Sequence, residues 1–69
     1  MKIEEFNNLQ KELLGKSVSV YLIGGSKLTG LWITNQVNSV TVSIRVVLKT
    51  EKGEIAIPLN QIKSIVELT

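Results

Sequence analysis

Apolar residues recur every three or four positions between Lys2 and Leu14, with glutamate, asparagine, glutamine and lysine between them. This spacing is typical of a helix with one apolar face. Gly15 follows directly, and glycine often ends a helix because it adopts a left-handed conformation at little cost. The pattern therefore predicts one amphipathic helix within residues 1–15.

After Gly15 the period changes to two. Apolar residues at even positions from Val18 to Leu22 alternate with serine and tyrosine, which predicts a strand. Gly24 and Gly25 then indicate a hairpin turn, and a second strand is expected from about Lys27 to Thr34.

A longer alternation follows the second strand. Asn35 and Gln36 are polar and compatible with a turn, so we expect a third strand beyond them, with valines and isoleucine on one face from Val40 to Leu48. The opposite face is expected to be mostly solvated.

Two short strands complete the pattern. Residues 50–53 form a turn, Ile55 begins a fourth strand, and Pro58 ends it because proline has no N–H to donate. A short turn over residues 59–61 and a brief fifth strand from Ile62 follow.

One helix and five closely connected strands predict a mainly β fold: a strongly bent, five-stranded antiparallel small β-barrel of the SH3 type. We expect a single domain over residues 1–69, with the helix in 1–15 and the barrel in 16–69. A flat sheet would leave one apolar face bare. Gly30 lies inside the second strand, and a residue without a side chain is where a sharp bend is easiest, so we expect the bend there.

The amino-acid composition limits which kinds of site and partner the protein can have. A chain of 69 residues buries only a small core, so small domains of this size often need additional stabilisation. The chain has no cysteine or histidine and therefore has neither a disulfide nor an ordinary zinc site. Oligomerisation is the remaining common way to stabilise such a domain. A net charge of +2 permits an anionic partner. No apolar run has the length of a membrane span or of a signal-peptide core, so a cytoplasmic location is the default expectation.

Catalytic residue types are scarce. The chain has no histidine, cysteine or aspartate, and its six glutamates fall on the helix, a turn and the chain end rather than in a pair. Gly24 and Gly25 precede a strand rather than a helix, so they do not form a phosphate loop. We therefore expect a protein that is not an enzyme and needs no cofactor.

Two stretches carry a family resemblance. The spacing of Gly15-Lys16, Val18, Val20, Leu22, Gly25, Leu28 and Gly30 resembles the first signature of the Sm/LSm family. The stretch from Ile57 to Ile65 is similar to the second signature in its apolar positions and in Asn60. Pro58-Leu59 stands where that signature has Arg-Gly and where bacterial Hfq has a Lys-His pair.

The resemblance implies a homo-oligomeric ring in which the fourth strand of one subunit pairs with the fifth strand of the next. Rings of five, six and seven subunits all remain open. It also implies binding of single-stranded RNA, with DNA as a further possibility, by two loops around the central pore.

The corresponding loop positions define candidate binding residues. The resemblance implies Asn35, Gln36 and Asn38 in the first loop and Asn60 and Lys63 in the second, because amides can read a base edge and a cation can contact phosphate. Arg45 and Lys49 would add charge.

Each candidate also has a structural interpretation. The loop amides could satisfy their own backbone, and Arg45 and Lys49 could only solvate a strand face. Trp32 and Tyr21 could stack on bases, although alternation favours packing for Trp32. The alternative function is a structural or protein-interaction barrel that oligomerises but has lost the RNA pocket.

Overall fold

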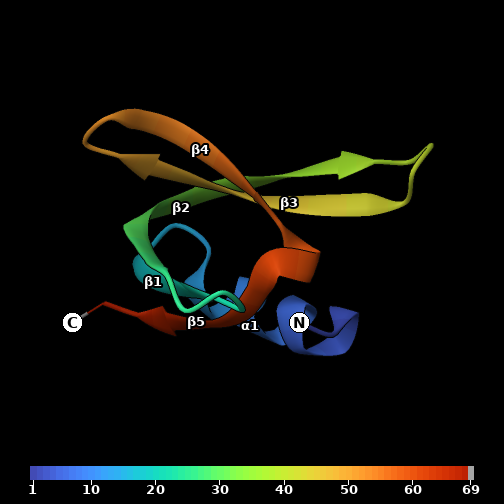
Figure 1. Ribbon diagram of the computed structural model, residues 1–69, viewed down its shortest axis with the longest axis horizontal. Coiled ribbons are helices and arrows are strands. Elements are labelled where there is room, and N and C mark those ends of the chain that lie inside the picture. The colour runs from blue at the N-terminus through green and yellow to red at the C-terminus, as the bar shows by residue number, and fades with distance from the viewer. Residues whose placement is uncertain (69) are drawn as a thin grey trace.

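One helix precedes five strands in the computed structural model, which describes residues 1–68. The elements are α1 (Ile3–Leu13), β1 (Ser17–Leu22), β2 (Lys27–Asn38), β3 (Ser43–Thr50), β4 (Gly53–Pro58), the 3-10 helix η1 (Leu59–Gln61) and β5 (Ile62–Glu67). The strands form one antiparallel sheet in the order β4-β3-β2-β1-β5 (Figure 1). This confirms the predicted fold class. Thr69, which the expected barrel includes, lies outside the described residues.

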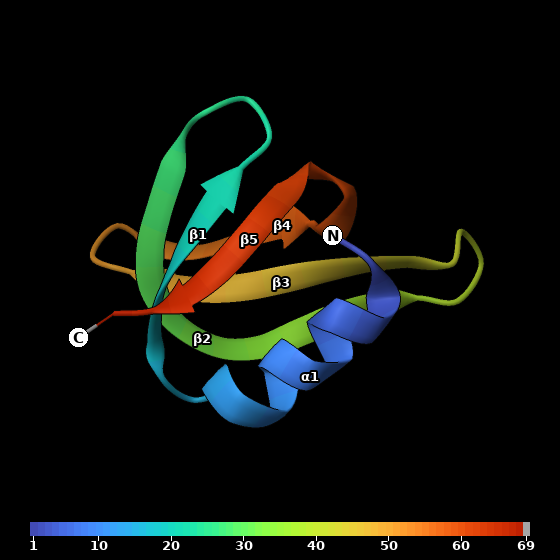
Figure 2. The same ribbon diagram turned by 90° about the horizontal axis from the view of Figure 1, so that it is seen from below.

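The long strand β2 belongs to both halves of the sheet. Its first part pairs with β1 and its second part with β3, and Leu31 is opposite both Ser17 and Lys49. β2 therefore curves around the molecule and brings the two halves face to face (Figure 2). β4 and β5 end the strand order without pairing with each other, so the barrel is open between them.

The bend occurs beside Gly30, as expected. A Cβ atom at Gly30 would lie 2.8 Å from the carbonyl oxygen of Lys49 and 3.3 Å from the Cβ of Leu48. The backbone of β3 occupies the space that any side chain on residue 30 would need. Glycine is therefore required here by close backbone approach.

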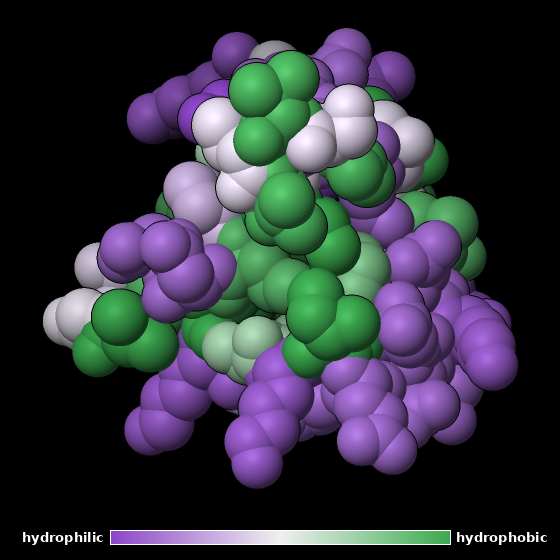
Figure 3. Space-filling view, turned by 90° about the vertical axis from the view of Figure 1, so that its right-hand side faces the viewer, coloured by the Kyte–Doolittle hydropathy of each residue, from purple (hydrophilic) through white to green (hydrophobic). Residues whose placement is uncertain are grey.

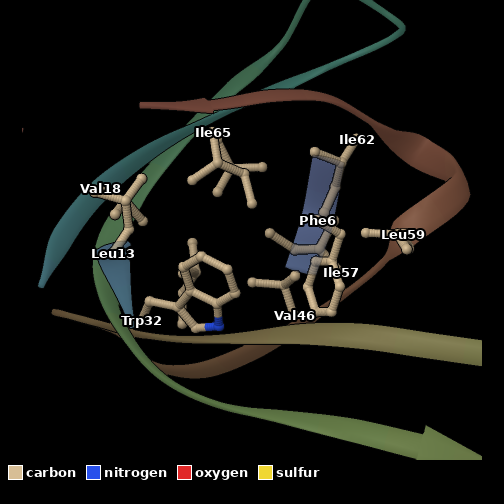
Figure 4. Packing of buried hydrophobic residues seen from close by; sticks show 11 residues of the cluster. Phe6, Leu13, Val18, Trp32, Val46, Ile57, Leu59, Ile62 and Ile65 are labelled. Atoms are coloured by element: carbon tan, nitrogen blue, oxygen red, sulfur yellow. The ribbon is translucent and has the colours of Figure 1, made fainter. Parts of the chain in front are cut away.

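The core lies between the two halves of the sheet and is covered by α1. Trp32 is completely buried in this core, and Phe6 of α1 packs against it with ring centroids 5.9 Å apart (Figure 4). The residues that form this core are Phe6, Leu13, Val18, Val20, Trp32, Val46, Leu48, Ile57, Leu59, Ile62 and Ile65. The packing interpretation of Trp32 is confirmed.

Gly15 ends the helical segment through a turn. Leu14 has φ −61° and ψ 129°, Gly15 has φ +91°, and the Lys16 N–H donates to the Leu13 carbonyl at 2.9 Å. These are the features of a type II turn, whose third residue needs a positive φ. The sequence predicted the helix and its glycine stop.

The β2–β3 hairpin is longer than predicted. β2 continues to Asn38, and β3 begins only at Ser43. The prediction of a turn at Asn35 and Gln36 is therefore wrong, since these residues pair with Val46 and Arg45. The outer part of the hairpin projects from the barrel, so polar residues fit on it without burial (Figure 1).

The expected third strand also differs at two points. Val40 and Val42 lie in the connection between the strands instead of on a strand face. Val47, on the face expected to be mostly solvated, is buried, and its partners in the sheet are Thr34 of β2 and Ala56 of β4.

Candidate nucleic-acid interface

A polar hollow lies along the projecting hairpin. It is open, has a volume of about 520 Å³, and is lined by Gln36, Val37, Asn38, Ser39, Thr41, Ser43 and Arg45. Gln36 and Arg45 are directly opposite each other on β2 and β3. The structure thus brings three of the sequence-predicted residues together, but on a hairpin rather than in a loop.

Asn60 joins this group through Arg45. A second hollow of about 410 Å³ includes Asn60, Pro58 and Leu59 on one side and Arg45 with its neighbours on the other. Arg45 lines both hollows, so it is the residue that the hollow of Gln36 and Asn38 shares with the hollow of Asn60. Amide and guanidinium groups can bind a base edge and a phosphate, respectively.

Two of the predicted amides also have structural roles. Asn35 Oδ1 accepts a hydrogen bond of 2.8 Å from the indole N–H of Trp32. Asn38 Oδ1 accepts hydrogen bonds from the backbone N–H groups of Val40 and Thr41, at 3.0 and 3.3 Å. The side-chain oxygens of both residues therefore stabilise the fold, which leaves their NH₂ groups for a ligand.

The two predicted lysines lie away from the hairpin hollows. Lys49 is four residues beyond Arg45 on β3, about 13 Å along a strand, and lines a separate hollow with Leu31 and Ile55. Lys63 is near the start of β5. Neither Lys49 nor Lys63 lines either of the two hollows that Arg45 lines.

Lys63 instead is next to the β5 partner of an exposed aromatic residue. Tyr21 of β1 is 39% exposed, is opposite Lys27 on β2 and is opposite Ser64 on β5. The β1–β5 register shifts directly after Tyr21, and Lys63 is the residue that this shift leaves unpaired. Cβ atoms of directly opposite residues are about 5 Å apart, so Lys27 and Tyr21 are neighbours across the strands.

The sequence suggested Tyr21 as a residue on which a base could stack, but it did not suggest which residues are near it. The period-two alternation places Tyr21 on the face of β1 that points away from the core, so its exposure could have been predicted. The nearby positions of Lys27 and Lys63 could not have been predicted, because they depend on the register of β1 with β2 and β5. We call Tyr21, Lys27 and Lys63 the tyrosine surface.

The cations at both surfaces are available to a ligand. In the part of the chain that the structure describes, the ion pair is Lys16 with Glu67, at 3.9 Å. Arg45, Lys27 and Lys63 have no carboxylate at ion-pair distance among those residues. Residues 1–68 also contain no cluster of carboxylates that could hold a metal ion.

Comparison with known proteins does not assign the chain to a family. No family model matches it, and neither the curated proteins nor the solved structures include a significant match. Within residues 1–68, α1 is too short and too polar to span a bilayer, and no other helix reaches that length.

Proposed function

We propose that this protein is a non-catalytic, ring-forming, Sm-like module that binds single-stranded nucleic acid, RNA in the first place. The observation that carries this proposal is the tyrosine surface: Tyr21 is partly exposed, Lys27 is its partner on β2, Lys63 is next to its partner Ser64 on β5, and neither lysine has a carboxylate at ion-pair distance within residues 1–68. Proteins that bind single strands combine aromatic rings, on which bases stack, with cations along the backbone.

The hollows around Arg45 supply a second contact. A base stacked on Tyr21 would be held mainly by its face, whereas the amides of Gln36 and Asn60 can bind a base edge. Arg45 can pair with a phosphate in the same strand. The candidate interface thus contains the three types of contact that single-stranded RNA requires.

The open edges of the sheet support the ring. Unpaired edge strands are prone to pair with another chain, and a head-to-tail contact closes into a ring when its rotation allows. Pairing of β4 with β5 of the next subunit would cover both edges. Six copies would carry a charge on the order of +10, which favours a polyanion.

Fluorescence anisotropy with labelled oligouridine, oligoadenine and oligothymidine tests the binding. We expect affinity to fall steeply as salt increases, because phosphate contacts release counterions. Tyr21→Leu should weaken binding about tenfold, since stacking contributes about 1–3 kcal/mol per base. Tyr21→Phe is the matched control and should keep most of the affinity. Absence of binding at low salt would exclude the nucleic-acid proposal.

A second candidate function is favoured by a separate observation. Val37, Val40 and Val42 on the hairpin are 71%, 90% and 87% exposed, and exposed apolar patches mark protein-interaction sites. A structural or protein-interaction barrel would assemble without binding any of the oligonucleotides, and its contacts would depend little on salt.

A further inference from the structure

The first part of β2 has an unpaired backbone edge. Residues 27–31 pair with β1, but pairing of β2 with β3 begins only at Leu31, which is opposite Lys49. Residues 27–30 therefore have a neighbouring strand on one side only. The β3–β4 turn diverges from β2 here, at the end of the molecule away from the projecting hairpin (Figure 1). Such an edge carries N–H and C=O groups with which another chain can pair.

The strand register identifies the groups that face this edge. In an antiparallel pair, the N–H and C=O groups of every second residue point to the partner strand, and those of the residues between them point away. The Trp32 N–H donates to the Lys16 carbonyl at 3.0 Å, and β1 and β2 stay in register over residues 27–31, so the even-numbered residues of β2 face β1. The N–H and C=O groups of Thr29 therefore point to the unpaired side.

An open hollow of about 660 Å³ lies along this edge. We call it the β2 notch: residues 27–31 of β2 line one side, residues 49–52 of β3 and the following turn line the other, and Ser17, Ile55 and Leu68 complete it. Ligand sites typically have volumes of about 300–1,000 Å³. The notch is therefore large enough for a short segment of another molecule.

The β2 notch is separate from the two hollows that Arg45 lines. Those hollows lie at the other end of the molecule, which Figure 3 faces and where apolar side chains gather in the middle of the surface. The notch shares no lining residue with either of them. Its occupant must therefore be identified from its own chemistry.

The charged residues that line the β2 notch are mostly cations. They are Lys27, Lys49 and Lys52, with Glu51 as the one carboxylate. Within residues 1–68 none of the three lysines has a carboxylate at ion-pair distance, although Glu54 is opposite Lys49 on β4. The lining thus has an excess charge of +2, which equals the net charge of the whole chain. Such a site favours an anionic occupant.

Two of the lysines lie on the face of the sheet that points away from the core. Lys27 and Leu31 share this face because they are four residues apart on β2, and Lys49 shares it because it is opposite Leu31. Leu28 lies on the other face, and both Leu28 and Ile55 pack against the core. A strand added to the unpaired edge would continue both faces. Its side chains would therefore meet lysines and apolar residues alternately.

We propose that the β2 notch binds an extended peptide segment of another protein, in which acidic and apolar residues alternate, as a short added strand of the sheet. Main-chain hydrogen bonds to Thr29 hold the segment, and its alternate side chains give specificity. Its carboxylates pair with the lysines, and its apolar side chains cover Leu28 and Ile55. The site uses an edge of β2, so it depends neither on the contact of β4 with β5 in the ring nor on nucleic-acid binding.

Nucleic acid fits the β2 notch less well than a peptide does. None of the residues that line it is aromatic, so a base has no ring on which to stack. A donor and an acceptor on one residue of a strand edge match the repeat of a peptide backbone, which nucleic acid lacks. Lys27 also belongs to the tyrosine surface, so substitutions at Lys49 and Lys52 are the ones that distinguish the two sites.

Titrations with two peptides of equal composition test the alternation. The probe has the sequence Glu-Val-Glu-Val-Glu with both ends blocked, and its matched control is Glu-Glu-Glu-Val-Val. We expect the probe to bind about tenfold more tightly, because only in the probe do all carboxylates and all valines point to opposite faces of a strand. Amide NMR spectra of the protein measure the affinity, with a shift expected at Thr29. Equal affinities, or no binding of the probe at millimolar concentration, would overturn the proposal.

Thr29→Pro tests the backbone contact. Proline has no N–H, and because the Thr29 N–H points away from β1, the hydrogen bonds between β1 and β2 remain. We expect the variant to fold, as circular dichroism would show, and to bind the probe about tenfold more weakly. Thr29→Val keeps the N–H and is the matched control, with affinity equal to that of the unaltered protein. Undiminished binding by the folded proline variant would contradict strand addition.

A pair of lysine substitutions tests the charge independently of the backbone. Lys49→Gln combined with Lys52→Gln should weaken binding of the probe about tenfold and reduce its dependence on salt. Lys2→Gln combined with Lys11→Gln is the matched control, because it removes the same charge from exposed positions outside the notch. Its affinity for the probe should be unchanged. Equal losses in the two double variants would mean that net charge alone attracts the peptide, which would refute the site.

Oligouridine binding by the same variants separates this site from the nucleic-acid proposal. Tyr21→Leu should weaken binding of oligouridine and leave binding of the probe unchanged. The Lys49 and Lys52 double variant should show the reverse. If that variant lost affinity for oligouridine as much as for the probe, and oligouridine displaced the probe, the β2 notch would be a nucleic-acid contact and the peptide proposal would be wrong.

Discussion

Asn35 Oδ1 accepts a 2.8 Å hydrogen bond from the indole N–H of Trp32, the largest completely buried side chain of the core. Without this bond the indole N–H of Trp32 would be buried without a hydrogen-bond acceptor. An amide that the sequence placed in a binding loop therefore completes the core, and its substitution acts first on stability.

Asn35→Ala should lower the free energy of unfolding by about 1–3 kcal/mol, because it leaves the indole N–H unsatisfied. Urea denaturation measures this change. In a Trp32→Phe background, which has no N–H, the same substitution should cost less than about 0.5 kcal/mol. Equal costs in the two backgrounds would show that the hydrogen bond is not the cause.

Gly30→Ala should destabilise the protein by about 1–3 kcal/mol, because its Cβ would lie 2.8 Å from the Lys49 carbonyl oxygen. Gly30→Val should cost more. Gly24→Ala is the matched control, since its Cβ meets no atom within 4 Å. Thermal unfolding compares the three variants, and an unchanged melting temperature for Gly30→Val would refute the close approach of β3.

Asn38→Ala should loosen the hairpin connection, because the N–H groups of Val40 and Thr41 lose their acceptor. We expect a stability loss of about 0.5–1.5 kcal/mol and faster amide hydrogen exchange at these two residues. Asn38→Asp keeps the acceptor oxygen and should retain the protection. Equal exchange in the alanine and aspartate variants would exclude this role.

Lys16→Ala should change stability by less than about 0.5 kcal/mol. Lys16 and Glu67 are 3.9 Å apart, and both side chains are about half exposed, so water and salt screen the pair. Urea denaturation at low and high salt measures the effect. A loss well above 1 kcal/mol would mean that Lys16 contributes more than this ion pair.

Local signals were sufficient for most of the fold. Gly15, Pro58 and the period-two alternation of β1 act within a few residues, so the helix stop, the end of β4 and the strand order along the chain could be predicted. Gly30 was interpretable because a glycine within a strand has few explanations.

The candidate site was less predictable, because it depends on strand register. A register shift near Ile33 changes which residues of β2 oppose β3, and the pairing then continues through Asn35 and Gln36. Polar residues that favour a turn locally were kept in a strand by this pairing. The neighbours of Tyr21 likewise follow from the shift in β1–β5, which leaves no signal in a single sequence.

The position of β1 between β2 and β5 has a consequence for the order of folding. β1 pairs on one side with the strand that follows it and on the other with the last strand, so that Leu22 is opposite Ile62. The three successive hairpins require only short loops to close, whereas this pairing closes a long one, which slows it. During synthesis β1 remains an unprotected edge until β5 has emerged, and in that interval the nascent chain is most exposed to misassembly.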